Sequence, residues 1–302
     1  MIQLPAGMQV FERGWLSSNN ILFIGEQQTA LVDSGYLSHA PQTLALVQQA
    51  LGERKLDLLV NTHLHSDHCG GNALLQRHYG CHTLIPVAET AAVAAWDEAA
   101  LSYAATGQQC ERFGFDAAIQ HGDSLQLGGM DWQVLAAPGH DPHSMILYCP
   151  QEGLLISADA LWENGFGVIF PELEGESGFA EQAAILQVIR ELNPRIVIPG
   201  HGPAFGNVAA ALERAESRLD YLSADPRRNA RNAAKVLLAF LLLESQRLSL
   251  SATLSQLGST RLVSSSARLL GLETDALMLQ MANELVTAGA ARLEHDMLIS
   301  TR

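Results

Sequence analysis

Short apolar stretches separated by turn residues mark the first part of the chain. Between residues 8 and 36, three such stretches alternate in the manner of a β-meander, with glycines between them. A helical pattern over residues 41–51 precedes a short, mostly apolar run at 56–60, which predicts a buried strand. The chain therefore begins with the strands and helix of a layered structure.

The pattern continues to alternate between strands and helices up to about residue 225. Helices are predicted at 70–79, 88–112 (a candidate flap), 179–192 and 208–223, and strands at 83–87, 124–127, 132–136, 145–149, 154–157 and 195–198. Two sets of strands interleaved with helices fit two sheets packed between helical layers. We therefore predict an α/β fold of the αββα sandwich type.

The character of the chain changes after the break at Asp225-Pro226. An apolar helix is predicted at 229–246, followed by two or three shorter helices and a terminal hairpin within 290–299. Helices that end in a hairpin resemble a winged helix. We therefore expect a catalytic domain over residues 1–225 and a small winged-helix-like domain over 226–302.

Composition supports a folded protein with a substantial core. Of the 302 residues, 48 % are hydrophobic and 17 % are charged. The formal net charge is −14, but residues 226–302 hold nine Lys/Arg against six Asp/Glu, so they carry +3 and the rest carries −17. An acidic main body disfavours non-specific nucleic-acid binding, which depends on neutralising phosphates.

The hydrophobicity pattern predicts neither a signal peptide nor a transmembrane helix. The N-terminus has no basic start with an apolar stretch, and no apolar run is long enough to span a bilayer. The four cysteines form no C-x-x-C pair. We expect a cytoplasmic protein with reduced thiols, no membrane partner and a small-molecule substrate; a homodimer stays open.

Candidate chemistry is concentrated directly after the strand at 56–60. The segment His63-Leu64-His65-Ser66-Asp67-His68 holds four metal-ligand side chains within six residues. Strand ends are where α/β sheets place their chemistry. Such a dense cluster indicates a metal site, although a single histidine is more often a surface or core residue.

Three further ligand candidates each follow a predicted strand. His140 and His201 both lie in Pro-Gly-His turns, and Asp159 comes shortly after the strand at 154–157. Proline ends a strand and glycine permits a sharp bend, which would turn each imidazole inward. Five histidines and two aspartates could form two three-residue sites and one bridging carboxylate.

This donor set suits first-row metals. Zinc is the default, and iron, manganese and nickel are also compatible. His143, close to His140, is a candidate catalytic proton donor or substrate contact. Cys69 is interpreted as a small buried residue rather than a ligand. Residues 162–170 are either a mobile pocket wall or an ordinary packed loop.

At these residues the chain resembles the metallo-β-lactamase superfamily, over roughly residues 8–205. The resemblance implies that His63, His65 and His140 bind one metal ion, and that Asp67, His68 and His201 bind the other, with Asp159 as the bridge. Asp33 matches a family turn and is expected beside the ligands. The layout also resembles the lactamase-B-like subgroup with a C-terminal winged-helix domain.

Several residues differ from those that characterise known subgroups of this superfamily, and each difference disfavours the activity of that subgroup. The bridging Asp159 disfavours a dedicated β-lactamase, and Pro203 and Trp162 stand where glyoxalase II and acyl-homoserine lactonases have tyrosines. Flavodiiron proteins have Glu in place of His65. The extra motifs of tRNA-processing members are also not apparent.

The preferred prediction is a dinuclear hydrolase of a small ester, thioester or lactone. A hydroxide bridging the metals would attack the carbonyl, and Asp67 would ligate and orient it. Three alternatives stay open: a metal-dependent endoribonuclease, an iron-dependent persulfide dioxygenase, and a non-enzymatic role of the C-terminal domain in binding nucleic acid or protein.

Overall fold

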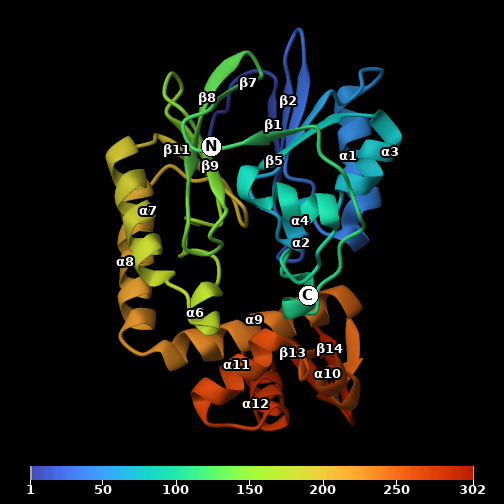
Figure 1. The fold of residues 1–302 in the computed structure, drawn as a ribbon, viewed down its shortest axis with the longest axis vertical. Helices are drawn as coiled ribbons and strands as arrows, with labels where there is room; N and C mark the ends of the chain where they lie inside the picture. The colour runs from blue at the N-terminus through green and yellow to red at the C-terminus, as the bar shows by residue number, and fades with distance from the viewer. Residues whose placement is uncertain (1, 302) are drawn as a thin grey trace.

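Two β-sheets lie face to face between helical layers in the computed structural model, which describes residues 2–301. The first sheet has the order β1-β2-β3-β4-β5-β6, with strands Met8–Phe11, Asn20–Ile24, Thr29–Val32, Leu58–Val60, His82–Pro86 and Ala117–Ile119. The second has the order β11-β10-β9-β8-β7, with strands Ile196–Pro199, Leu154–Ala158, Met145–Cys149, Met130–Ala136 and Ser124–Leu127. This arrangement confirms the predicted α/β sandwich (Figure 1).

Helices cover the outer face of each sheet. The helices and 3-10 turns on the side of the first sheet are η1 (Leu37–His39), α1 (Ala40–Leu51), α2 (Ser66–Cys69), α3 (Asn72–Tyr79), η2 (Val87–Glu89), α4 (Thr90–Ala95) and α5 (Tyr103–Thr106). The outer face of the second sheet is covered by α7 (Phe179–Leu192) and α8 (Val208–Ser223), and α6 (Pro171–Glu174) lies at the lower end of the sandwich (Figure 1).

Three apolar clusters hold these layers together. One lies between the sheets, around the fully buried Trp132 and Phe23, whose rings meet edge to face at 5.5 Å. A second packs α7 and α8 on the second sheet, and a third packs α1 and α3 on the first. Burial of these apolar faces is the main force that stacks the layers.

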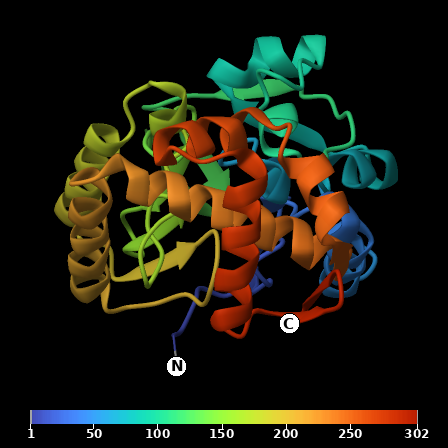
Figure 2. The same cartoon turned by 90° about the horizontal axis from the view of Figure 1, so that it is seen from below.

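The C-terminal part of the chain closes one end of the sandwich. It contains α9 (Pro226–Ser245), α10 (Leu250–Leu257), α11 (Arg261–Leu270), α12 (Thr274–Thr287), and a sheet of order β12-β14-β13 with strands Arg247–Ser249, Met297–Ser300 and Ala291–Glu294. Seen from below, these elements lie across the ends of both sheets (Figure 2). The helical C-terminal region is thereby confirmed.

Several local predictions were wrong. The helix predicted at 70–79 begins two residues later, as α3 at Asn72, and is preceded by the short helix α2, which was not predicted. Gly70 and Gly71 lie between the two helices, where a Cβ would collide with the backbone of η1 or Ser34. The predicted helix over 88–112 contains only α4 and α5, since Trp96 and Ser102 adopt left-handed backbone conformations. The edge strands β6 and β12 were not foreseen.

Candidate metal centre

Four chain segments deliver the seven predicted ligand side chains to one place. The loop after β4 and the short helix α2 carry the His63–His68 cluster, and His140, Asp159 and His201 follow β8, β10 and β11. All seven side chains are buried, with residue exposures of at most 9 %. Side chains from distant parts of the chain therefore share one water-poor site.

His63, His65 and His140 converge on a single point. His65 Nδ1 lies 3.1 Å from His63 Nε2 and 2.8 Å from His140 Nε2. A neutral imidazole has only one N–H, so three converging rings direct lone pairs at one another. A cation held among these nitrogens would resolve that conflict, and the three residues match a three-ligand metal site.

Asp67, His68 and His201 form a second group with metal-ligand spacing. Asp67 Oδ2 lies 3.0 Å from His201 Nε2 and 3.9 Å from His68 Nε2. His68 Nε2 is buried and has no hydrogen-bond partner among the residues that the structure describes. An unpaired buried nitrogen is costly unless a ligand occupies it.

Asp159 lies between the two groups. Its Oδ2 is 3.4 Å from His140 Nε2 and 3.9 Å from His201 Nε2, and its Oδ1 is 3.5 Å from His68 Nε2. Trp162 donates a hydrogen bond to Asp159 Oδ1 over 3.1 Å. The carboxylate thus faces both groups of histidines, which is the placement required of a bridge.

The outer nitrogens of four ligand rings are held by neighbouring groups. His68 Nδ1 donates to Asp33 Oδ2 over 2.8 Å, and His140 Nδ1 donates to the Val168 carbonyl. His63 Nδ1 meets Thr62 Oγ1 at 3.1 Å, and His65 Nε2 lies 3.3 Å from Asp141 Oδ2. Such partners fix the tautomer and leave the other nitrogen free to bind metal.

The pKa shifts of the buried histidines differ between the two groups. Burial lowers the pKa of His140 to about 4, and burial also lowers the pKa of His63 and His65, which favours neutral rings that could bind a metal ion. Burial acts in the same direction on His68, but the carboxylates of Asp33, Asp159 and Asp67 outweigh it and raise the pKa of His68. The carboxylates are concentrated around the second group.

Several residues at the site have positive φ angles, which are unusual for residues other than glycine. Asp33 has φ +59° and accepts hydrogen bonds from both Thr62 N and Thr62 Oγ1, and Ala158, just before Asp159, has φ +45°. A left-handed non-glycine residue costs on the order of 1 kcal/mol. Gly139 has φ +138°, as predicted for a sharp bend before His140. Gly200 is required for a different reason, because a Cβ there would collide with Asp159.

A small cavity of about 80 Å³ opens onto this cluster. Its walls include Trp162, Val168 and Phe170 of the 162–170 segment, and also Trp15 and Phe240 from distant parts of the chain. The Trp15 ring stacks on His201 with a centroid distance of 5.5 Å. Sequence reasoning missed Trp15 and Phe240, because no motif or local pattern links either residue to the ligands.

His143 lies beside the ligands rather than among them. It lines a separate cavity of about 510 Å³ whose wall also includes His65 and His140. Its Nδ1 donates to the buried Glu89 over 2.6 Å, and its backbone N donates to Asp141. That hydrogen bond to Glu89 raises the pKa of His143. The sequence had no signal for Glu89 or for the contact of Asp141 with His65.

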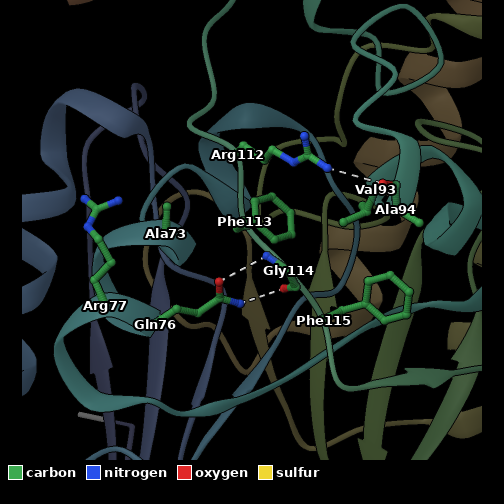
Figure 3. A pocket seen from close by; sticks show the side chains of 9 residues that line it. All are labelled: Ala73, Gln76, Arg77, Val93, Ala94, Arg112, Phe113, Gly114 and Phe115. Carbon is green, nitrogen blue, oxygen red and sulfur yellow. Dashed lines mark hydrogen bonds between the residues drawn. The ribbon is translucent and has the colours of Figure 1, made fainter.

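Two other features lie apart from the chemistry. The buried Cys69 Sγ contacts the Leu64 and His65 carbonyls and the Tyr103 hydroxyl, consistent with a packed thiol. A cavity of about 540 Å³ between α3, α4 and residues 112–115 has no ligand-type side chain among its described lining residues. There the Gln76 side-chain amide donates a hydrogen bond to the Gly114 carbonyl and accepts one from the Gly114 N–H, so this contact serves the fold (Figure 3).

Comparison with known proteins agrees with this geometry. A family model described as "Metallo-beta-lactamase superfamily" matches residues 13–201. A hydroxyacylglutathione hydrolase of Brucella anthropi is 26 % identical over 186 residues, covering 61 % of this chain and 58 % of that protein. One from Bradyrhizobium is 29 % identical over 156 residues, covering 47 % and 53 %. The chain thus spans about half the length of the curated relatives it matches.

Solved structures share the fold over nearly the whole chain. A metallo-beta-lactamase family protein from Thermus thermophilus superposes with a TM-score of 0.60 at 19 % identity, covering 99 % of this chain and 100 % of that one. A beta-lactamase domain protein from Burkholderia ambifaria gives 0.56 at 17 % identity, covering 99 % and 94 %. No helix within residues 2–301 is long and apolar enough to cross a membrane.

Proposed function

Since the chain belongs to the metallo-beta-lactamase superfamily, we propose that it is a dinuclear metal-dependent hydrolase of small esters, thioesters or lactones. The observation that carries the proposal is the position of Asp159, whose two carboxylate oxygens face both groups of buried histidines. The names of the matched relatives, hydroxyacylglutathione hydrolases, support an ester-type carbonyl as the reacting group.

In the proposed reaction, the metal ions and the protein side chains have separate roles. Bound metal ions, with zinc as the default, would act as Lewis acids and lower the pKa of water from about 15.7 to roughly 7. His63, His65 and His140 would hold one ion, and Asp67, His68 and His201 the other, with Asp159 shared. Asp67 Oδ2 would also orient the attacking water, and the Trp15 and Trp162 rings would exclude bulk solvent.

The C-terminal region, in our proposal, is a winged-helix-like unit that begins at Pro226 and covers the site. Its apolar core, to which Ala105, Val168 and Leu173 of the main body also contribute, includes much of α9, and a three-stranded sheet follows this first helix. Residues Val236, Leu237 and Phe240 of α9 line the metal pocket. The four cysteines, free within the described chain, fit the reduced cytoplasmic setting that we propose.

A substrate screen tests the reaction class. Protein purified without added metal would be analysed for its elements and then assayed with an activated ester, an acyl thioester, a lactone and an RNA oligonucleotide. We expect turnover of one or more of the first three and none of RNA. Cleavage of RNA alone would establish an endoribonuclease, and oxygen consumption with a persulfide would establish a dioxygenase.

His143 is proposed as the proton donor to the leaving group. Its ring lines the cavity that also reaches His65 and His140, and Glu89 holds its Nδ1, which leaves Nε2 for a substrate. Substituting His143 by Gln should lower kcat/KM for alkyl esters, which have poor leaving groups, by about 10²-fold. The loss should be much smaller for p-nitrophenyl esters, because p-nitrophenolate leaves without a proton.

The pH profile gives an independent readout for His143. Its pKa is raised, with Glu89, Asp141 and Glu176 as the carboxylates that act on it. The contribution of a protonated His143 is therefore present below this raised pKa and lost as pH rises through it. The Gln variant should lack that alkaline decline, whereas His82→Gln, whose side chain is 76 % exposed, should keep it. Equal losses for both ester types would contradict the assignment.

A further inference from the structure

A second cavity adjoins the metal pocket beneath α9. It has a volume of about 270 Å³ and lies between Trp15, α9 and the end of the C-terminal sheet. Apolar side chains dominate its wall, including Ala239, Leu243 and Leu285, and Lys235 lies at the wall as well. Lys235 Nζ is 3.4 Å from Glu284 Oε2, so its charge already has a partner.

Three residues are shared by this cavity and the metal pocket. Trp15, Val236 and Phe240 line both, so the two spaces adjoin at these side chains. Phe240 is held in place by an edge-to-face contact with the buried Tyr36 at 5.1 Å. A group that extends from the metals past Phe240 would therefore enter an apolar space with a defined wall.

This apolar surface is open to solvent. Trp15 is 48 % exposed and Val236 is 36 % exposed, although most large apolar residues of the chain are buried. Contiguous exposed apolar surface beside a site of chemistry is typical of ligand binding. The only charge at its described wall, that of Lys235, is paired with Glu284, so the lining favours an apolar group over a charged one.

The opposite side of the metal pocket has a contrasting character. The 510 Å³ cavity there is lined by Glu89, Asp141, His143, Glu174 and Arg261. A leaving group needs a proton and an exit to water, and the polar cavity provides both through His143 and its open mouth. The apolar cavity is then left for the other arm of the substrate, the acyl chain.

We propose that the cavity lined by Trp15, Val236, Ala239 and Phe240 binds the acyl chain of the substrate, which is therefore an ester or thioester of an apolar, medium-length acid. This inference rests on the proposed hydrolase function and adds the substrate class. The acidic wall of the polar cavity, with Glu89, Asp141, Glu174 and Glu176, further disfavours leaving groups with a net negative charge, such as glutathione.

Two series of esters test the proposal on the metal-loaded protein. Each buried methylene contributes about fourfold to transition-state binding, so kcat/KM of p-nitrophenyl esters should rise on the order of 10²-fold from acetyl to hexanoyl. Alkyl acetates of increasing alcohol length should show no comparable rise. Ala239→Trp should fill the cavity and reduce the hexanoyl-to-acetyl ratio at least about tenfold, whereas Ala276→Trp, on the exposed side of α12, should not.

A binding measurement separates this inference from the proposed function. Titration calorimetry of 1-octanol on native protein should show saturable binding that Ala239→Trp abolishes and Ala276→Trp retains. Hydrolysis without dependence on acyl length, or with dependence on alcohol length instead, would overturn the acyl site and leave the hydrolase standing. If no ester, thioester or lactone is hydrolysed, the hydrolase proposal fails, and octanol binding alone then decides whether the apolar site exists. Absence of binding would overturn it.

Discussion

Asp159→Asn is expected to lower hydrolysis of the best substrate by about 10³-fold, the equivalent of several kcal/mol of transition-state stabilisation. The amide keeps the size of the side chain and can still accept the hydrogen bond from Trp162. It removes the second anionic oxygen, which faces His140 and His201. We therefore expect metal content to fall from about two ions per chain towards one, because the shared ligand is weakened.

Elemental analysis and steady-state kinetics on the same preparation would measure both effects. Asp220→Asn, at an exposed position on α8, is the matched control and should keep full activity and full metal content. A variant at Asp159 that retains both metals and wild-type kcat/KM would show that this carboxylate is not a bridge. The proposed bridging role of Asp159, which carries the functional proposal, would then have to be abandoned.

Removing the metals is expected to abolish hydrolysis and to lower thermal stability. The described ligand groups are buried, and without a cation their converging lone pairs and the unpaired His68 Nε2 destabilise the folded state. A ligand present at about 1,000 times its Kd stabilises by roughly 4 kcal/mol, which corresponds to a fall in Tm of roughly 10 °C on its removal.

The experiment compares protein treated with a chelator, and then dialysed, with the same sample after zinc is added back. Zinc should restore both activity and Tm, and calcium, which prefers more oxygen ligands, should restore neither. Full activity in a sample shown by elemental analysis to lack metal would disprove metal-dependent hydrolysis. Loss of activity with an unchanged Tm would show that the metals contribute little to folding.

Local patterns in the chain were sufficient for much of the scaffold. The helices over 179–192 and 208–223 have the predicted bounds, since each has an apolar face with helical spacing and clear ends. In contrast, α9 begins at Pro226 rather than at 229, because Asp225 caps the helix by accepting from Arg227 N. A proline interpreted as a break is here the first residue of the next helix.

The sequence by itself determined the candidate ligands. Four ligand-type side chains within His63–His68, and two Pro-Gly-His turns, are recognisable without a structure, because a dense local motif carries its chemistry in its spacing. Only the tertiary structure decided the shape and polarity of the space around them. Trp15, Asp141 and α9 reach the site through contacts between distant segments, and such contacts depend on how whole layers bury their apolar faces, which no local pattern records.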